Sequence, residues 1–293
     1  LVKHHLIAGD NLVLLTKEIT DEIMKIEAIL TGNCDVFPVI FRERLSTKFI
    51  AKAITSHLQT QMTTIVAVDN IEHAVPLLCH LTAFMYDFQR MRSNSRLASL
   101  PNPCFYLQVV RKTPEIPYES LLLFSRPFTW IDLTKQEVWQ SPDLISQVSF
   151  YNNFKTHVRF QFDGPQEDIK TQENRILQGY KLHPAIECKW MVTVVEKLNK
   201  CPASDTAWYA KQYLNELTER SMVLAKITEI WVNKQQTAFL QAQETTDLMT
   251  ETQISDKEEL FMVVMVASIF DQRVYQWVFG ARKNAYRQLM STL

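Results

Sequence analysis

Residues 46–70 read STKFIAKAITSHLQTQMTTIVAVDN, and this stretch decides the fold class. Its first half has the apolar spacing of an amphipathic helix, with Ser46 or Thr47 as the N-cap. The apolar face of that helix is formed by Phe49, Ile50, Ala53, Ile54 and Leu58. The second half changes period, because the β-branched run 63–68 is typical of a buried strand. A helix followed at once by a buried strand predicts a sheet covered by helices.

The segments that follow this strand continue the α/β pattern to about residue 140. Residues 71–88 predict a helix, in which Pro76 is tolerated because it falls in the first turns. The polar residues 92–103 predict a loop. Four further strands are predicted at Cys104–Val110, Tyr118–Phe124, Phe128–Leu133 and Lys135–Trp139.

The second half of the chain is almost wholly helical in pattern. Residues 143–162 predict a helix that ends at Asp163-Gly164-Pro165, and the longest predicted helix covers residues 204–241. A further helix is predicted at 256–270, and an amphipathic helix at 11–30 precedes the α/β part. The fold class is therefore α/β followed by all-α. Its three expected parts are a helical segment at 1–45, an α/β lobe at 46–163 and a helical lobe at 164–293.

Composition excludes several classes of protein. The net charge of -1 gives no whole-chain attraction to nucleic acid or to an acidic membrane. The longest dense apolar stretch, Leu260–Phe270, is shorter than the roughly 20 residues that cross a bilayer. The 5 cysteines are widely spaced without a C-x-x-C, which favours reduced thiols in the cytosol. Because the chain starts at Leu1 without Met, we expect it to be a fragment.

The search for catalytic or metal-binding groups gives no active site. His73 and His80 share a face of one predicted helix, but seven residues apart they lack zinc-ligand spacing. His57 lies at a helix end, where an imidazolium would favour the C-terminal dipole. Glu258-Glu259 begin a helix, and they are expected to stabilise its N-terminus. The 5 glycines are not clustered, so a phosphate-binding loop is not expected. We therefore expect no catalytic residue, no cofactor and no metal.

Large apolar side chains in the helical half are the candidates for a protein–protein interface. Core packing and interface contact both explain such side chains, and the pattern alone leaves both open. The candidate interface residues are Tyr213, Leu217, Leu224, Trp231 and Trp277. They are chosen because paired folds need a large apolar contact.

Three stretches carry a resemblance to a known family. The first is Phe49–Thr60, which ends in Ser-His-Leu-Gln-Thr ahead of a valine-rich strand. The second is Trp130–Leu133 with its polar turn. The third comprises the acidic-capped helix 256–270, the Phe-Gly-Ala-Arg turn 279–282 and Leu289-Met290. In order and spacing the chain resembles the chromosome 9 open reading frame 72 family over about residues 46–293. Residues 165–250 match that family only in helical character.

The resemblance implies a DENN-type fold, with a central sheet flanked by helices and a C-terminal helical lobe. Residues 1–45 then resemble the segment that links a longin domain, absent from this chain, to the DENN core. The resemblance also implies a heterodimer with a second longin–DENN protein, the Smith–Magenis-region partner, and a WD-repeat subunit. Such complexes act on small GTPases of the Rab and Arf groups in autophagy, lysosomal signalling and membrane traffic.

The leading functional hypothesis is a non-catalytic subunit of a GTPase-activating complex. In this family the activating arginine is assigned to the partner, so no catalytic residue is expected in this chain. We expect a cytoplasmic protein that its partners recruit to lysosomal or autophagy-related membranes. The runner-up is a guanine-nucleotide exchange factor for Rab proteins. A third hypothesis is a helical scaffold without GTPase contact.

Overall fold

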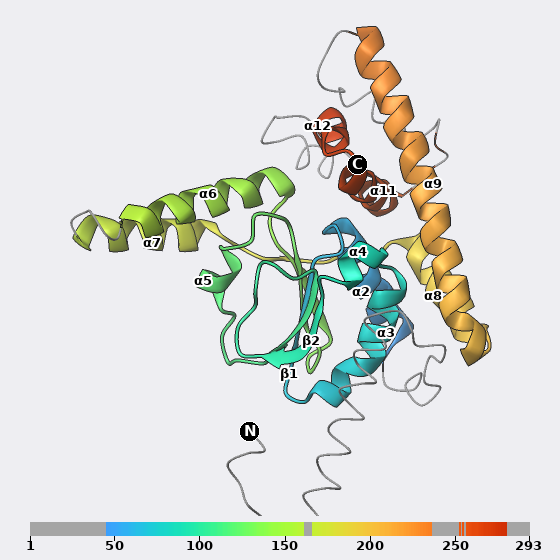
Figure 1. Ribbon diagram of the computed structural model, residues 1–293, viewed down its shortest axis with the longest axis horizontal. Coiled ribbons are helices and arrows are strands. Elements are labelled where there is room, and N and C mark those ends of the chain that lie inside the picture. Colours follow the sequence, from blue (N-terminus) through green and yellow to red (C-terminus); the bar gives the residue numbers. More distant parts are fainter. Residues whose placement is uncertain (1–44, 161–165, 236–251, 253, 255, 280–293) are drawn as a thin grey trace, which may run out of the picture.

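A six-stranded mixed sheet forms the centre of the first half of the chain (Figure 1). The computed structural model describes residues 45–160, 166–235, 252, 254 and 256–279. The strand order is β2-β3-β1-β4-β5-β6. The strands are β1 Thr64–Val68, β2 Asn94–Ala98, β3 Leu107–Arg111, β4 Thr129–Asp132, β5 Glu137–Gln140 and β6 His183–Pro184. The predicted helix at 11–30 lies outside the described residues.

Strand direction divides the sheet into two parts. β1 pairs in parallel with β3 and β4, and β2 pairs in parallel with β3. β5 and β6 add an antiparallel edge. Helices pack on both faces of this sheet, as is usual for sheets with parallel strands. β6 lies beyond residue 163, so part of the predicted helical half completes the sheet.

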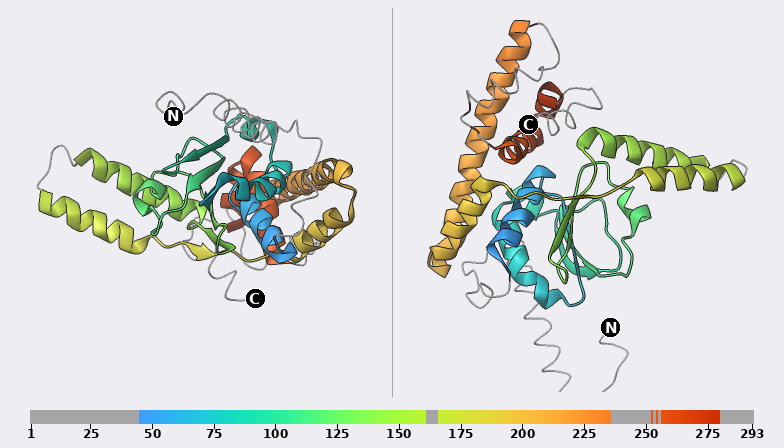
Figure 2. Two further views of the ribbon diagram at one scale, coloured as in Figure 1. Left: turned by 90° about the horizontal axis from the view of Figure 1, so that it is seen from below. Right: turned by 180° about the vertical axis from the view of Figure 1, so that it is seen from behind.

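The two faces of β1 pack against different helices. Val66 and Val68 belong to the main core, under α2 (Thr47–Gln59) and α3 (Val75–Ala83). Ile65 and Ala67 face a second core, formed with α5 (Tyr118–Leu121) and the base of the α6–α7 hairpin. α6 (Leu144–Phe160) and α7 (Gln166–Gly179) extend away from the sheet on the side opposite α2 and α3 (Figures 1 and 2).

Helix α2 confirms the prediction made from residues 46–59. Ser46 is its N-cap, with a hydroxyl that accepts a hydrogen bond from the Phe49 backbone N–H at 3.2 Å. All of the apolar residues predicted to share one face are buried. The helix is wedged between the sheet and the helical part, so burial extends to polar residues on its other faces as well.

Three sequence predictions in the α/β part are wrong. The helix predicted at 71–88 is broken into a 3-10 turn η3 (Ile71–Ala74), α3 and a short α4 (Asp87–Arg90), because Phe84 and Met85 leave the helix and are buried. The loop predicted at 92–103 contains the edge strand β2. The strand predicted at 118–124 is the short helix α5, which buries Leu121 and Leu122 against the second core.

The helical part contains α8 (Lys189–Lys200), α9 (Ala203–Gln235), α11 (Lys257–Phe270) and α12 (Arg273–Phe279). α11 lies between α2 and α9 and packs on both (Figure 1). Its residues from Met262 to Ser268 are all buried, so it is the central helix of this part. The main core runs without interruption from the sheet through α2 and α11 to α9.

Candidate functional site

The inner face of α9 carries three of the predicted interface residues. Leu217 and Leu224 are fully buried in the main core, where α9 packs on α11. Tyr213 is half-buried and lies edge-on to the ring of Trp190 in α8, with centroids 6.4 Å apart. These side chains already have packing partners within this chain.

The other two predicted residues lie toward the end of the helical part. Trp277 is half-buried in α12, with the Arg273 guanidinium 5.0 Å from the centre of its ring. Trp231 belongs to α9, but its side chain lies outside the described residues. The structure therefore brings Leu217 and Leu224 together in the core, while Trp277 packs at a different position. An interface role for the five residues stays a prediction.

The outer face of α9 exposes a second set of apolar side chains. They are Trp208, Tyr209, Met222, Val223 and Ile230. Spacings of seven and fourteen residues place them on one broad side of the helix. Trp208 is 58% exposed and Val223 is 55% exposed, so both are accessible to a partner. We call this set the outer α9 face.

Sequence reasoning missed the outer α9 face although its signal is present. The periodicity of Tyr213, Leu217 and Leu224 marks one side of the helix, and that side is the buried one. Met222 and Val223 stand next to this set along the chain but point to another side. The outer side of α9 thus combines apolar and polar side chains, and among the described residues its apolar members stay exposed.

The start of α11 carries carboxylates that serve packing. Asp256 is the N-cap and accepts a hydrogen bond from the Glu258 backbone N–H at 2.9 Å. The Glu258 side chain is buried and accepts a hydrogen bond from Gln59 Nε2 at 2.8 Å, so it links α11 to α2. Burial raises the pKa of Glu258 above its ordinary value. Glu259 pairs with Arg220 of α9. Glu258 and Glu259, predicted to stabilise the start of the helix, thus also connect α11 to α2 and α9.

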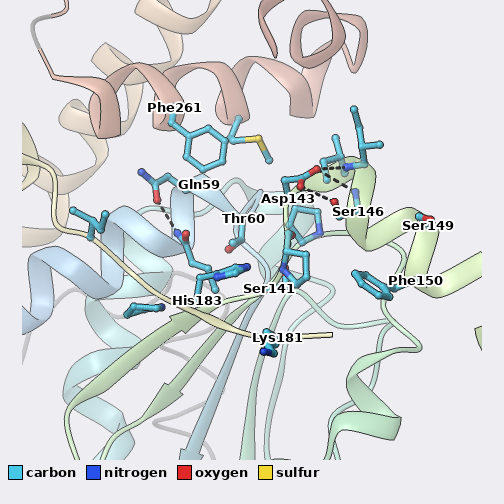
Figure 3. A pocket seen from close by; sticks show the side chains of 18 of the residues that line it. Gln59, Thr60, Ser141, Asp143, Ser146, Ser149, Phe150, Lys181, His183 and Phe261 are labelled. Carbon is cyan, nitrogen blue, oxygen red and sulfur yellow. Dashed lines mark hydrogen bonds between the residues drawn. The ribbon is translucent and has the colours of Figure 1, made fainter. Parts of the chain in front are cut away.

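A cavity of about 770 Å³ lies where the α/β part meets the helical part (Figure 3). Its wall is formed by the end of β5, the first turns of α6, the segment before β6 and the start of α11. Apolar side chains such as Phe150, Phe261 and Met265 contribute to the lining. Its size falls in the range of ligand sites in proteins.

The polar groups of this cavity are bonded to one another. Gln140 Nε2 donates to Gln59 Oε1 at 2.7 Å, and Gln59 in turn donates to Glu258. The Asp143 carboxylate caps α6 by accepting from the Ile145 backbone N–H at 3.0 Å and from the Ser146 hydroxyl at 2.7 Å (Figure 3). The carboxylates therefore position helices, and the arrangement has no activated nucleophile among these residues.

His57 does not act as the predicted cation at a helix end. The side chain is fully buried, and its Nδ1 lies 2.8 Å from the Thr64 hydroxyl. Burial lowers the pKa of His57 to about 3, so the imidazole is neutral at physiological pH. The earlier interpretation is wrong because it treated a buried helix end as a solvated one.

Two searches bear on metals and membranes. Within the described ranges, three or more His, Cys, Asp or Glu side chains never come together as a set that could hold a metal ion. Of the helices in those ranges, none is both long enough and apolar enough to span a bilayer.

The described part of the chain is thus a sheet covered by helices, with a helical part whose longest helix exposes several apolar side chains. Family comparison agrees with the resemblance seen in the sequence. A model of the C9orf72-like protein family matches residues 7–147, which include α2, all the parallel strands and the start of α6. This match over residues 7–147 supports the assignment of the chain to the chromosome 9 open reading frame 72 family. No curated protein sequence matches the chain.

Proposed function

We propose that this chain is a non-catalytic DENN subunit of a heteromeric complex that regulates small GTPases of the Rab and Arf groups. The proposal extends to autophagy, lysosomal signalling and membrane traffic as the processes served. Family membership supports it, because DENN-type proteins of this family are expected to work in such complexes. The observation that carries it is the outer α9 face, where five exposed apolar side chains stand among exposed polar residues such as Gln212 and Glu219.

The outer α9 face has the dimensions of a subunit interface. A helix of 33 residues is roughly 50 Å long, since each residue adds about 1.5 Å. A standard interface buries about 800 Å² on each partner, and tryptophan and tyrosine contribute strongly to its binding energy. Trp208 and Tyr209 lie at one end of this face, edge-on with centroids 4.9 Å apart. Met222 and Val223 lie further along the helix. A second longin–DENN protein, the Smith–Magenis-region partner, is the proposed occupant, with a WD-repeat subunit bound in the same complex.

We assign the GTPase-activating arginine to the partner subunit. GTP hydrolysis is accelerated by an arginine placed at the developing phosphate charge, and only one subunit needs to supply it. This chain would then act by holding the arginine-bearing subunit in position. Its own exposed apolar residues bind the partner, and the assembled complex meets the GTPase.

Co-expression with the longin–DENN partner tests the proposal. Met222→Asp and Val223→Asp place charges on the outer α9 face, and we expect each to abolish co-purification while far-UV circular dichroism stays unchanged. Leu100→Asp is the matched control, because Leu100 is similarly exposed but lies in the α/β part. Mass photometry of the purified sample should show the heterodimer for the native chain and the control only.

Activity assays separate the proposal from its alternatives. The complex should accelerate GTP hydrolysis by a Rab or Arf protein, whereas the chain alone should not release bound nucleotide. Nucleotide release by the chain alone would show an exchange factor. Failure of the complex to retain any GTPase in either nucleotide state would leave a scaffold without GTPase contact.

A further inference from the structure

Four aromatic rings form a continuous row on the surface where the α/β part meets α11. The ring of Phe270, at the end of α11, lies 5.2 Å from Tyr86. Tyr86 stacks on Phe88 of α4 at 6.0 Å, and Phe88 lies edge-on to Tyr106 at 6.2 Å. Phe88 is 41% exposed and Phe270 is 46% exposed. Segments far apart in the sequence therefore build one apolar surface, with α4 lying between the sheet and α11 (Figure 1).

Hydrogen bonds to α9 and to the end of α2 fix the position of these rings. The Tyr86 hydroxyl lies 2.7 Å from the Thr218 hydroxyl of α9. Gln89 of α4 is buried and donates a hydrogen bond to the Gln61 carbonyl at 3.1 Å, which fixes α4 against the end of α2. A partner that binds pre-positioned rings loses little side-chain entropy at this surface.

Arginine side chains extend the row at its Tyr106 end. The Arg126 guanidinium lies 3.9 Å from the centre of the Tyr106 ring and donates hydrogen bonds to the carbonyls of Pro103 and Phe105, at 3.1 and 3.0 Å. Arg92 is exposed and close enough to Arg126 to lower the pKa of Arg126 by charge repulsion, beside the larger effect of burial. Two positive charges thus lie near one another at this end of the row.

The carboxylate of Asp87, at the start of α4, is exposed and lies 3.4 Å from Arg90 Nη1. Arg92 is exposed, whereas Arg126 uses Nη2 on two carbonyls and has a buried Nε, so Arg92 is the more accessible positive charge for a ligand. We call Tyr86, Phe88, Tyr106, Phe270, Arg92 and Arg126 the aromatic–arginine surface.

We propose that the aromatic–arginine surface binds an acidic protein segment that carries a bulky apolar side chain. The apolar side chain contacts Phe88 and Phe270, and the carboxylates pair with Arg92 and Arg126. Arginine at such a site can bind a carboxylate through two parallel hydrogen bonds, which gives specificity as well as energy. None of these six residues belongs to the outer α9 face, so the inference goes beyond the proposed function and does not depend on it.

Two other occupants fit less well. A second copy of this chain would desolvate Arg92 and Arg126, while the Asp87 that it brings is already paired with Arg90. A lipid membrane fits less well, because the four rings pack against one another instead of projecting singly, as membrane-inserting side chains would.

A fluorescein-labelled peptide, Glu-Asp-Glu-Phe-Asp-Glu-Leu-Glu-Asp, is the probe for the full-length chain. Fluorescence anisotropy should show saturable binding that weakens as NaCl rises from about 0.05 to 0.5 M. We expect Phe88→Ala and Phe270→Ala each to weaken binding about tenfold, and Arg92→Glu to weaken it further. Val223→Ala on α9 is the matched control and should bind as the native chain does, with thermal melting confirming that each variant is folded.

Three results would overturn this inference. One is equal binding of a peptide in which lysine replaces every acidic residue. Another is unchanged affinity in folded Phe88→Ala and Phe270→Ala variants. The third is binding to vesicles with about a fifth phosphatidylserine that competes with the peptide, since anionic lipid would then be the occupant.

Discussion

Helices α2 and α9 are both amphipathic, but they meet their surroundings in different ways. α2 is buried at 10 of its 13 residues, including polar ones such as Ser56 and Gln59, because it is packed between the sheet, α8 and α11. α9 buries Leu217 and Leu224 on one side and exposes Met222 and Val223 on another. α2 is thus almost wholly buried by its own chain, whereas α9 keeps exposed apolar side chains among the described residues, which we propose as the contact with a second protein. The difference separates residues that stabilise the fold from residues that stay exposed to solvent.

The largest expected effects come from core leucines on both helices. Leu58→Ala in α2 and Leu224→Ala in α9 should each lower the free energy of unfolding by about 2 to 5 kcal/mol, since both side chains are fully buried. Val223→Ala, one residue from Leu224, should change it by less than about 0.5 kcal/mol. Urea denaturation followed by circular dichroism measures all three. A similar loss for Val223→Ala would show that the outer α9 face already packs within this chain.

The next largest effect on the free energy of unfolding should come from the ion pair Arg220–Glu259. Arg220 of α9 pairs with the mostly buried Glu259 of α11 and also lies 5.6 Å from the Trp190 ring. Arg220→Met keeps the apolar stem but leaves the carboxylate without its partner, so we expect a loss of about 2 kcal/mol. Lys226→Met removes the exposed pair with Glu229 on the same helix and should leave thermal stability unchanged. Equal melting temperatures for the native chain and Arg220→Met would contradict this account.

The buried His57 of α2 should make the free energy of unfolding depend on pH. Its folded pKa of about 3 is below its ordinary value of 6.5, so the unfolded chain takes up the proton first. The stability that comes with a neutral His57 is present above pH 6.5 and is lost as pH falls toward 3. Between pH 7 and 5 the native chain should lose about 2 kcal/mol from this group. In His57→Asn the fall in unfolding free energy over that range should be smaller by this amount. An unchanged slope would mean that His57 is not buried as a neutral imidazole.

The N-cap of α2 should give the smallest measurable effect. Ser46→Ala removes the hydroxyl that accepts from the Phe49 N–H, and we expect a loss of about 1 kcal/mol. Ser46→Asp restores an acceptor and should recover most of that loss. An unchanged free energy of unfolding in Ser46→Ala would mean that α2 is stabilised by its packing alone.

The sequence predicts those parts of the fold that local signals determine. α2, β1 and α11 have clear caps, periods and ends, and each lies within one or two residues of its prediction. α5 was predicted as a strand because an apolar run such as Leu121-Leu122-Leu123 has no period that separates a strand from a short buried helix. β6 has two residues and exists only because β5 is there to pair with it.

The candidate sites were harder to predict than the fold. A single periodic stripe on α9 was found, but it was the buried one, since periodicity reports apolar spacing and not which side meets solvent. Tyr86 and Phe270 come together only through the packing of α11 against α9, so no local pattern predicts the aromatic–arginine surface. The family match, by contrast, covers two of the three short motifs and supports the family that they indicated.

Hydrogen–deuterium exchange of the chain alone and in complex with its longin–DENN partner tests the contrast between α2 and α9 most directly. We expect the amides of α9 around Met222 and Val223 to exchange more slowly in the complex, while those of α2 stay equally slow in both states. Unchanged exchange along α9 in a complex that mass photometry shows to be intact would contradict the account.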